Sequence, residues 1–142
     1  MQYNMPMRLE FVFKGLPPST NNLFLTIGKR RVKTKEYREY EAYIHICLAI
    51  RGDKAIFKDA GNSPYRMIIE LSAPDWICAN GNVRRKDIGN LEKSLSDCIA
   101  SFYGWRDENC FELIIRKVDG AVSMTKAIFE FPSRDALHPL RS

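Results

Sequence analysis

The spacing between apolar residues changes along this chain, and that change constrains its fold more than any other feature. Apolar side chains occupy every second position from Leu9 to Phe13 and again from Tyr65 to Ala73, which is typical of strands with one buried face. Between Thr34 and Arg51 they recur three or four positions apart, which is typical of an amphipathic helix. Residues from Asn90 to about Tyr103 repeat the helical spacing. The chain therefore alternates strands with helices.

Two further strands are expected at residues 111–118 and 126–131. Asp119-Gly120 between them is a turn signal and predicts that they form a hairpin. The expected order is strand, helix, strand, helix, strand, strand. A small mixed sheet flanked by helices buries these faces most simply, so the predicted fold class is α+β. The length fits a single domain, residues 1–142, in which the polar tail from about residue 132 is expected to be loose.

Composition excludes several classes of protein. Four cysteines are present, but none lies within five residues of another, so the chain has no C-x-x-C zinc or redox motif. No apolar run approaches the roughly 20 residues that a membrane helix needs, and the start of the chain lacks the apolar segment of a signal peptide. We therefore expect a cytoplasmic protein with reduced thiols and no membrane partner.

Positive charge is concentrated between Gly28 and Arg38. Six of these eleven residues are basic, and no acid precedes Glu36. Holding so many like charges together is unfavourable without an anion, which favours a nucleic-acid backbone as the partner. A solvated loop that leads into a helix is the alternative. No base-reading motif accompanies the run, so recognition would depend on backbone charge and shape. Its basic residues are Lys29, Arg30, Arg31, Lys33, Lys35 and Arg38.

Acidic and basic side chains gather around the second helix. With about 100° of rotation per residue, its apolar residues share one face, which we expect to face the core: Leu91, Leu95, Cys98 and Phe102. A separate polar sector contains Asn90, Lys93, Ser94, Asp97 and Ser101. The residues just before the helix are Arg84, Arg85, Lys86 and Asp87, and the acidic pair Asp107-Glu108 follows it.

This set of side chains is suited to phosphodiester chemistry. Mg²⁺ prefers oxygen ligands and is often held by one or two carboxylates together with water and phosphate. Such ions activate water and stabilise the leaving oxygen, while a lysine can neutralise the scissile phosphate. Flanking arginine and lysine side chains would hold the backbone of a polyanion. The structural alternatives are a helix cap, solvated surface charges and a turn before a strand.

Two stretches together resemble the RusA family of Holliday-junction resolvases. The first is Gly-Leu-Pro-Pro-Ser-Thr-Asn-Asn at residues 15–22, which follows a strand and precedes a basic segment and the pair Tyr37-Arg38. The second is the family pattern Arg-Arg, then Asp-x-Asp-Asn-x-x-Lys-x-x-x-Asp, then a later acidic pair. Residues 87–97 read Asp-Ile-Gly-Asn-Leu-Glu-Lys-Ser-Leu-Ser-Asp, and Trp105 precedes the acidic pair. The resemblance covers residues 9–131.

The resemblance implies a homodimer that nicks paired strands of four-way DNA junctions symmetrically in DNA recombination and repair. It implies dependence on Mg²⁺, with Mn²⁺ as an alternative, and an origin in a phage or prophage. The implied metal ligands are Asp87, Asp97, Asp107 and Glu108. The implied catalytic residues are Asp87, Lys93, Asp107 and Glu108. DNA contacts are expected from the basic run and from Asn21, Arg84, Arg85, Lys86 and Asn90.

Gly89 departs from the family pattern, because it stands where the family has its second aspartate. Glycine offers no side-chain ligand and loosens the backbone. Three outcomes are open: Asp97 or Asp107 substitutes as a ligand, or one metal suffices at a reduced rate, or the chain binds junctions without cutting them. The second functional hypothesis is therefore a non-catalytic protein that binds junctions or forks. A third is a general basic adaptor for RNA or ribosomal surfaces.

Overall fold

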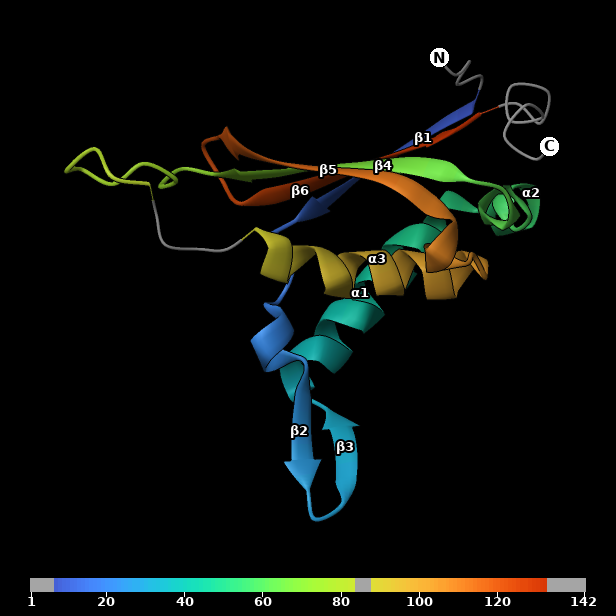
Figure 1. Cartoon of the computed structure of the whole chain (residues 1–142), viewed down its shortest axis with the longest axis horizontal. Coiled ribbons are helices and arrows are strands. Elements are labelled where there is room, and N and C mark those ends of the chain that lie inside the picture. Colours follow the sequence, from blue (N-terminus) through green and yellow to red (C-terminus); the bar gives the residue numbers. More distant parts are fainter. Residues whose placement is uncertain (1–6, 84–87, 133–142) are drawn as a thin grey trace.

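The structure, a computed structural model, describes residues 7–83 and 88–132. A four-stranded sheet lies on one side of the two long helices (Figure 1). The strand order is β1-β6-β4-β5, in which β4 and β5 run parallel and the other neighbours run antiparallel. The strands are β1 (Met7–Lys14), β4 (Tyr65–Ala73), β5 (Cys110–Asp119) and β6 (Met124–Phe131). The helices are α1 (Lys35–Arg51) and α3 (Gly89–Tyr103). The mixed sheet with flanking helices confirms the predicted fold class.

Local sequence signals set the ends of the helices. The Thr34 side chain caps α1 by accepting a hydrogen bond from the backbone N–H of Tyr37 at 3.1 Å. Gly52 ends α1 in the left-handed conformation, with φ of 70°, and Gly104 ends α3 in the same way, with φ of 76°. The short helix α2 (Lys54–Phe57) follows α1.

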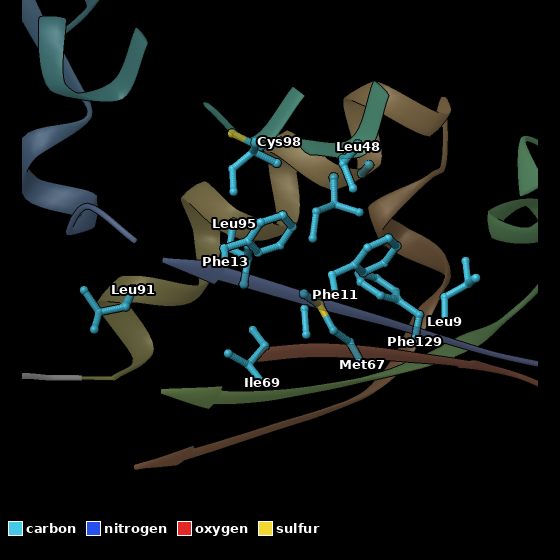
Figure 2. Close-up of a cluster of buried hydrophobic side chains, with 14 of the residues drawn as sticks. Leu9, Phe11, Phe13, Leu48, Met67, Ile69, Leu91, Leu95, Cys98 and Phe129 are labelled. Carbon is cyan, nitrogen blue, oxygen red and sulfur yellow. The ribbon is translucent and has the colours of Figure 1, made fainter. Parts of the chain in front are cut away.

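The core lies between the sheet and the two helices, where the alternating faces of β1 and β4 meet the apolar face of α3. Figure 2 shows these side chains converging from the strands and from both helices. The helix α1 buries Tyr37, Ile44 and Leu48 against them, as its apolar spacing predicts. All four cysteines are free thiols, and Cys98 is buried in this core. No helix in the described ranges has the length and apolar character needed to span a bilayer.

The predicted hairpin of the last two strands is wrong. Strands β5 and β6 lie on opposite sides of β4 and do not pair with each other. Their connection crosses the end of β4, where the backbone N–H of Gly120 donates to the carbonyl of Ala73 at 3.3 Å. The turn signal correctly marks a chain reversal, but it carries no information about which strand is the neighbour. Here α3 acts as the crossover that places β5 parallel to β4.

The basic run also forms an element that its sequence did not predict. Strands β2 (Phe24–Ile27) and β3 (Arg30–Lys33) pair antiparallel around a turn at Gly28, whose φ is 62°. This hairpin, which we call the arm, projects away from the sheet and the helices (Figure 1). Most of the basic run therefore belongs to a two-stranded arm that leads into α1.

Some predictions concern residues outside the described ranges. Arg84, Arg85, Lys86 and Asp87 fall there, and so does the tail from residue 133. Their proposed roles stay predictions.

Candidate active site

Lys93 lies between two carboxylates. Its Nζ donates to Oδ1 of Asp97 at 2.9 Å and to Oδ2 of Asp107 at 3.4 Å. Asp97 lies one turn further along α3, whereas Asp107 lies beyond the end of that helix, in the 3₁₀ helix Asp107–Asn109. The hydrogen bond from Lys93 to Asp97, followed by the charges of both acids, raises the pKa of Lys93 and keeps the amine protonated.

The three side chains are open to solvent, at 52% for Lys93, 35% for Asp97 and 59% for Asp107. Exposed ion pairs contribute little to folding stability, because water screens them and their side chains lose freedom on pairing. The cluster is therefore accessible to an anionic ligand. It joins three of the residues that the sequence singled out, from both ends of one helix.

Packing around Trp105 brings Asp107 back towards α3. The chain reverses at Gly104, and the Trp105 ring then stacks on Tyr103 with centroids 4.5 Å apart. Trp105 Nε1 donates to the carbonyl of Phe57 at 2.7 Å. Gly61 makes room for the ring, since an added Cβ would lie 2.2 Å from Trp105 Cγ. This buried contact fixes the start of the turn that carries Asp107.

Glu108 does not join the Lys93 cluster. Its Oε1 pairs with Nε of Arg106 at 3.2 Å, and both side chains are exposed. In the part of the chain that the structure describes, no ion pair links Glu108 to Lys93. Of the four expected carboxylate ligands, two therefore converge on the amine, one pairs elsewhere, and Asp87 lies outside the described residues.

The loop of residues 15–22, which precedes the arm, is held against the first turns of α3 by two hydrogen bonds. Thr20 Oγ1 donates to the carbonyl of Asn90 at 2.9 Å, and Ser94 Oγ donates to the carbonyl of Pro18 at 3.0 Å. Ser94 is fully buried, unlike Lys93 of the same polar sector. The hydrogen bond to Pro18 satisfies its hydroxyl, which makes burial possible. Asn21 is exposed in the same loop.

The predicted DNA-binding residues of the basic run occupy different environments. Arg31 lies over the Phe24 ring at 4.0 Å, and Lys33 forms an ion pair with Glu41 at 2.8 Å. Lys35 pairs with Glu39 at 3.7 Å. The other three residues are exposed: Lys29, Arg30 and Arg38. The arm and the start of α1 thus carry a positive surface in which a few local acids neutralise part of the charge.

The outer face of the sheet differs from the arm. Arg66 pairs with Glu112 at 3.3 Å and with Glu130 at 3.2 Å. Lys126 pairs with Glu10 at 2.6 Å. Arg66 and Lys126 are therefore matched by acids, whereas Lys29, Arg30 and Arg38 on the side of the arm are exposed.

The Lys93 cluster partly fits a metal site. Among the described residues, no group of three or more His, Cys, Asp or Glu side chains is placed to hold a metal. Asp97 and Asp107 nevertheless face one positive charge, the Lys93 ammonium, and Mg²⁺ needs as few as one or two carboxylates when water and phosphate complete its shell. Oxygen ligands of this kind suit Mg²⁺ or Mn²⁺.

Sequence reasoning missed the residues that position the site. Thr20 and Ser94 tie the loop to α3, and Gly61 accommodates Trp105. Thr20 and Ser94 stood within motifs that the sequence had singled out, although not for this contact, whereas Gly61 did not. Nothing in the sequence signals that Gly61 and Trp105 meet, because 44 residues separate them and the contact depends on the fold.

Comparison with known proteins identifies a family for most of the chain. The family model described as Endodeoxyribonuclease RusA matches residues 15–126. The matched region contains the loop, the arm, α3 and the turn that carries Asp107. A search of the curated proteins finds no match to the chain.

Proposed function

The chain belongs to the RusA family of endodeoxyribonucleases, and from this membership we propose that it is a metal-dependent nuclease that resolves Holliday junctions and other branched DNA by paired nicking. The observation that carries the proposal is the position of Lys93, which faces Asp97 and Asp107 on an exposed surface. That surface joins the positively charged side of the molecule through the loop before the arm.

In this proposal Lys93 acts electrostatically. In the free protein the hydrogen bond to Asp97 and the charges of both acids raise the pKa of Lys93, which suits the amine to act as a positive charge. A protonated lysine neutralises the developing charge on the scissile phosphate. The present partners of the amine, Asp97 and Asp107, would release it as DNA enters.

Asp97 and Asp107 are the described residues that would hold the divalent ion, together with Asp87. When bound, that ion supplies Lewis-acid chemistry and an activated water. We propose Mg²⁺, with Mn²⁺ as an alternative, because the available ligands are carboxylate oxygens.

We expect DNA to contact the basic residues around the arm and the neutral polar residues beside α3. Backbone phosphates attract the arm and Arg38, while Asn21 and Asn90 lie near the loop that is tied to α3. Further DNA contacts would come from Arg84, Arg85 and Lys86. Symmetric nicking requires two sites, and we propose that a homodimer supplies them, in recombination and repair of DNA in the cytoplasm.

One observation favours a second function. Gly89 provides no carboxylate, and Glu108 pairs with Arg106 instead of joining the Lys93 cluster. A site with fewer carboxylates holds metal more weakly. The second candidate is therefore a protein that binds junctions or forks without cutting them.

A cleavage assay distinguishes the two functions. A labelled synthetic four-way junction is incubated with wild type, Lys93→Ala and Gly89→Asp over a wide range of Mg²⁺ and Mn²⁺. Lys126→Ala is the matched control, because Lys126 also pairs with an acid but lies on the outer sheet face. The nuclease proposal expects paired nicks from wild type and Lys126→Ala and none from Lys93→Ala. Junctions that wild type binds but leaves uncut, while Gly89→Asp cuts them, would support the second function.

A further inference from the structure

The two faces of the arm differ in chemistry. Residues directly opposite each other in an antiparallel pair share a face, so the pairs Leu25–Val32 and Ile27–Arg30 define one face. On this face Leu25 is 57% exposed and Ile27 is 64% exposed, while Val32 is partly buried. The opposite face carries Arg31 stacked over Phe24. The arm therefore presents an apolar face that ends at a basic tip.

This apolar face is a candidate binding surface. Among residues 7–83 and 88–132, β2 and β3 pair only with each other, and an isolated two-stranded hairpin is marginally stable in water. The arm projects from the sheet and the helices (Figure 1), and Phe24 on its other face packs against Tyr37 of α1. Large aliphatic side chains gathered on one exposed face mark a binding surface.

Charge identifies the partner. Four of the ten residues from Phe24 to Lys33 are basic and none is acidic. A second copy of the arm would be repelled, whereas a polyanion is attracted. DNA whose bases are unstacked offers both phosphates and flat apolar surfaces, and a branch point is a place where a protein can unstack bases at lower cost than within a duplex.

The arm is also fixed relative to the Lys93 cluster. At its root, Thr34 Oγ1 donates to the carbonyl of Asn22 at 2.6 Å, and the N–H of Thr34 donates to the carbonyl of Leu23 at 2.9 Å. The preceding loop is bonded to α3 through Thr20 and Ser94. A ligand bound to the arm therefore takes a defined position relative to Lys93.

We infer that the apolar face of the arm, formed by Leu25, Ile27 and Val32, inserts against unstacked bases at the branch point of four-way DNA. Aliphatic side chains act as such wedges in other proteins that bend DNA. The inference rests on the proposed function and gives it a basis for selectivity, because an intact duplex exposes no base face to the wedge. The basic residues of the arm would bind the phosphates of a four-way junction and those of an intact duplex alike.

The test uses a synthetic four-way junction with 2-aminopurine beside the branch point, and a duplex with the same label, both in EDTA so that no cutting occurs. Unstacking raises the fluorescence of 2-aminopurine. The variant Leu25→Ser/Ile27→Ser removes the apolar face and keeps every basic residue. Ile50→Ser is the matched control, because Ile50 is 80% exposed on α1, outside the arm. Circular dichroism and light scattering check the fold and the oligomeric state of each protein.

Wild type and Ile50→Ser are expected to raise the fluorescence of the junction and not that of the duplex. The double variant is expected to lose this rise, and its preference for junction over duplex should fall by about tenfold. Junction binding by wild type without a rise overturns the inference and leaves the proposed function standing. Equal wild-type affinity for junction and duplex overturns both. A double variant that keeps the rise overturns the inference, and a double variant that loses oligomers formed by wild type would assign the face to a second copy of the chain instead.

Discussion

The amine of Lys93 lies 3.4 Å from a carboxylate oxygen of Asp107, although 14 residues and a reversal of the chain separate the two along the sequence. The contact joins the first turns of α3 to the turn beyond its end. It places a protonated amine and two carboxylates on one accessible surface, and the predictions for the active site follow from it.

Replacing Lys93 separates its role at phosphate from the role of the carboxylates. In Lys93→Met the ammonium no longer competes for Asp97 and Asp107, so the affinity of the free protein for Mn²⁺ should rise or stay unchanged. Junction cleavage should nevertheless fall by about a hundredfold or more, because the charge that stabilises the phosphate is lost. Calorimetric Mn²⁺ titration and single-turnover cleavage measure the two effects. A parallel loss of Mn²⁺ affinity would show that Lys93 only supports the metal site.

The salt dependence of DNA binding should reveal which basic residues meet phosphates. Arg30→Ala, at the tip of the arm, is expected to lower the slope of log affinity against log salt by about one. Lys126→Ala should leave the slope unchanged, because Lys126 is paired with Glu10 on the outer sheet face. Fluorescence anisotropy at several salt concentrations provides the slopes. Equal effects of the two substitutions would contradict the placement of DNA on the side of the arm.

The contact between Gly61 and Trp105 should be necessary for stability. Gly61→Ala would place a Cβ 2.2 Å from Trp105 Cγ and is expected to cost about 1–3 kcal/mol of unfolding free energy, as overpacking does. In a Trp105→Ala background the same substitution should cost much less, because the ring is gone. Urea unfolding of wild type, the two single variants and the double variant measures the coupling between the two positions. Additive costs would mean that the ring and Gly61 are not coupled.

The thiol of Cys98 should stay protonated and unreactive in the folded protein. Burial, followed by the negative charge of Glu41, raises the pKa of Cys98 to about 12 from an ordinary value of 9.0. Since the folded state then binds the proton more tightly, stability should fall as pH rises above 9.0. Urea midpoints across that range, with Cys98→Ala as the control, measure the effect. Ellman's reagent should label exposed Cys78 and spare Cys98 until unfolding, and rapid labelling of Cys98 would contradict its burial.

Much of the fold could be predicted because single elements carry their own periodicity. The alternation in β4 and the apolar spacing of α3 marked buried faces before any neighbour was known. The pairing of β5 was missed, because a turn signal does not specify which strand lies alongside. The arm was missed for a different reason: its strands have four residues each, and arginine and lysine hide their alternation.

The candidate site could be predicted only as a set of residue types. A helical projection placed Lys93 and Asp97 on one sector, and the structure joins them. The approach of Asp107 depends on Trp105 packing against Gly61, which is a tertiary contact that local spacing does not encode. The separate pairing of Glu108 with Arg106 depends on the same turn.

Single-turnover cutting of a labelled four-way junction by Asp107→Asn, with junction binding measured in parallel, is the most direct test of this active site. Asparagine keeps the shape of the side chain and removes the negative charge that faces Lys93. Junction binding should be retained, and cutting in Mg²⁺ should fall to background. A variant that cuts at the wild-type rate would contradict the assignment of this cluster as the centre of the reaction.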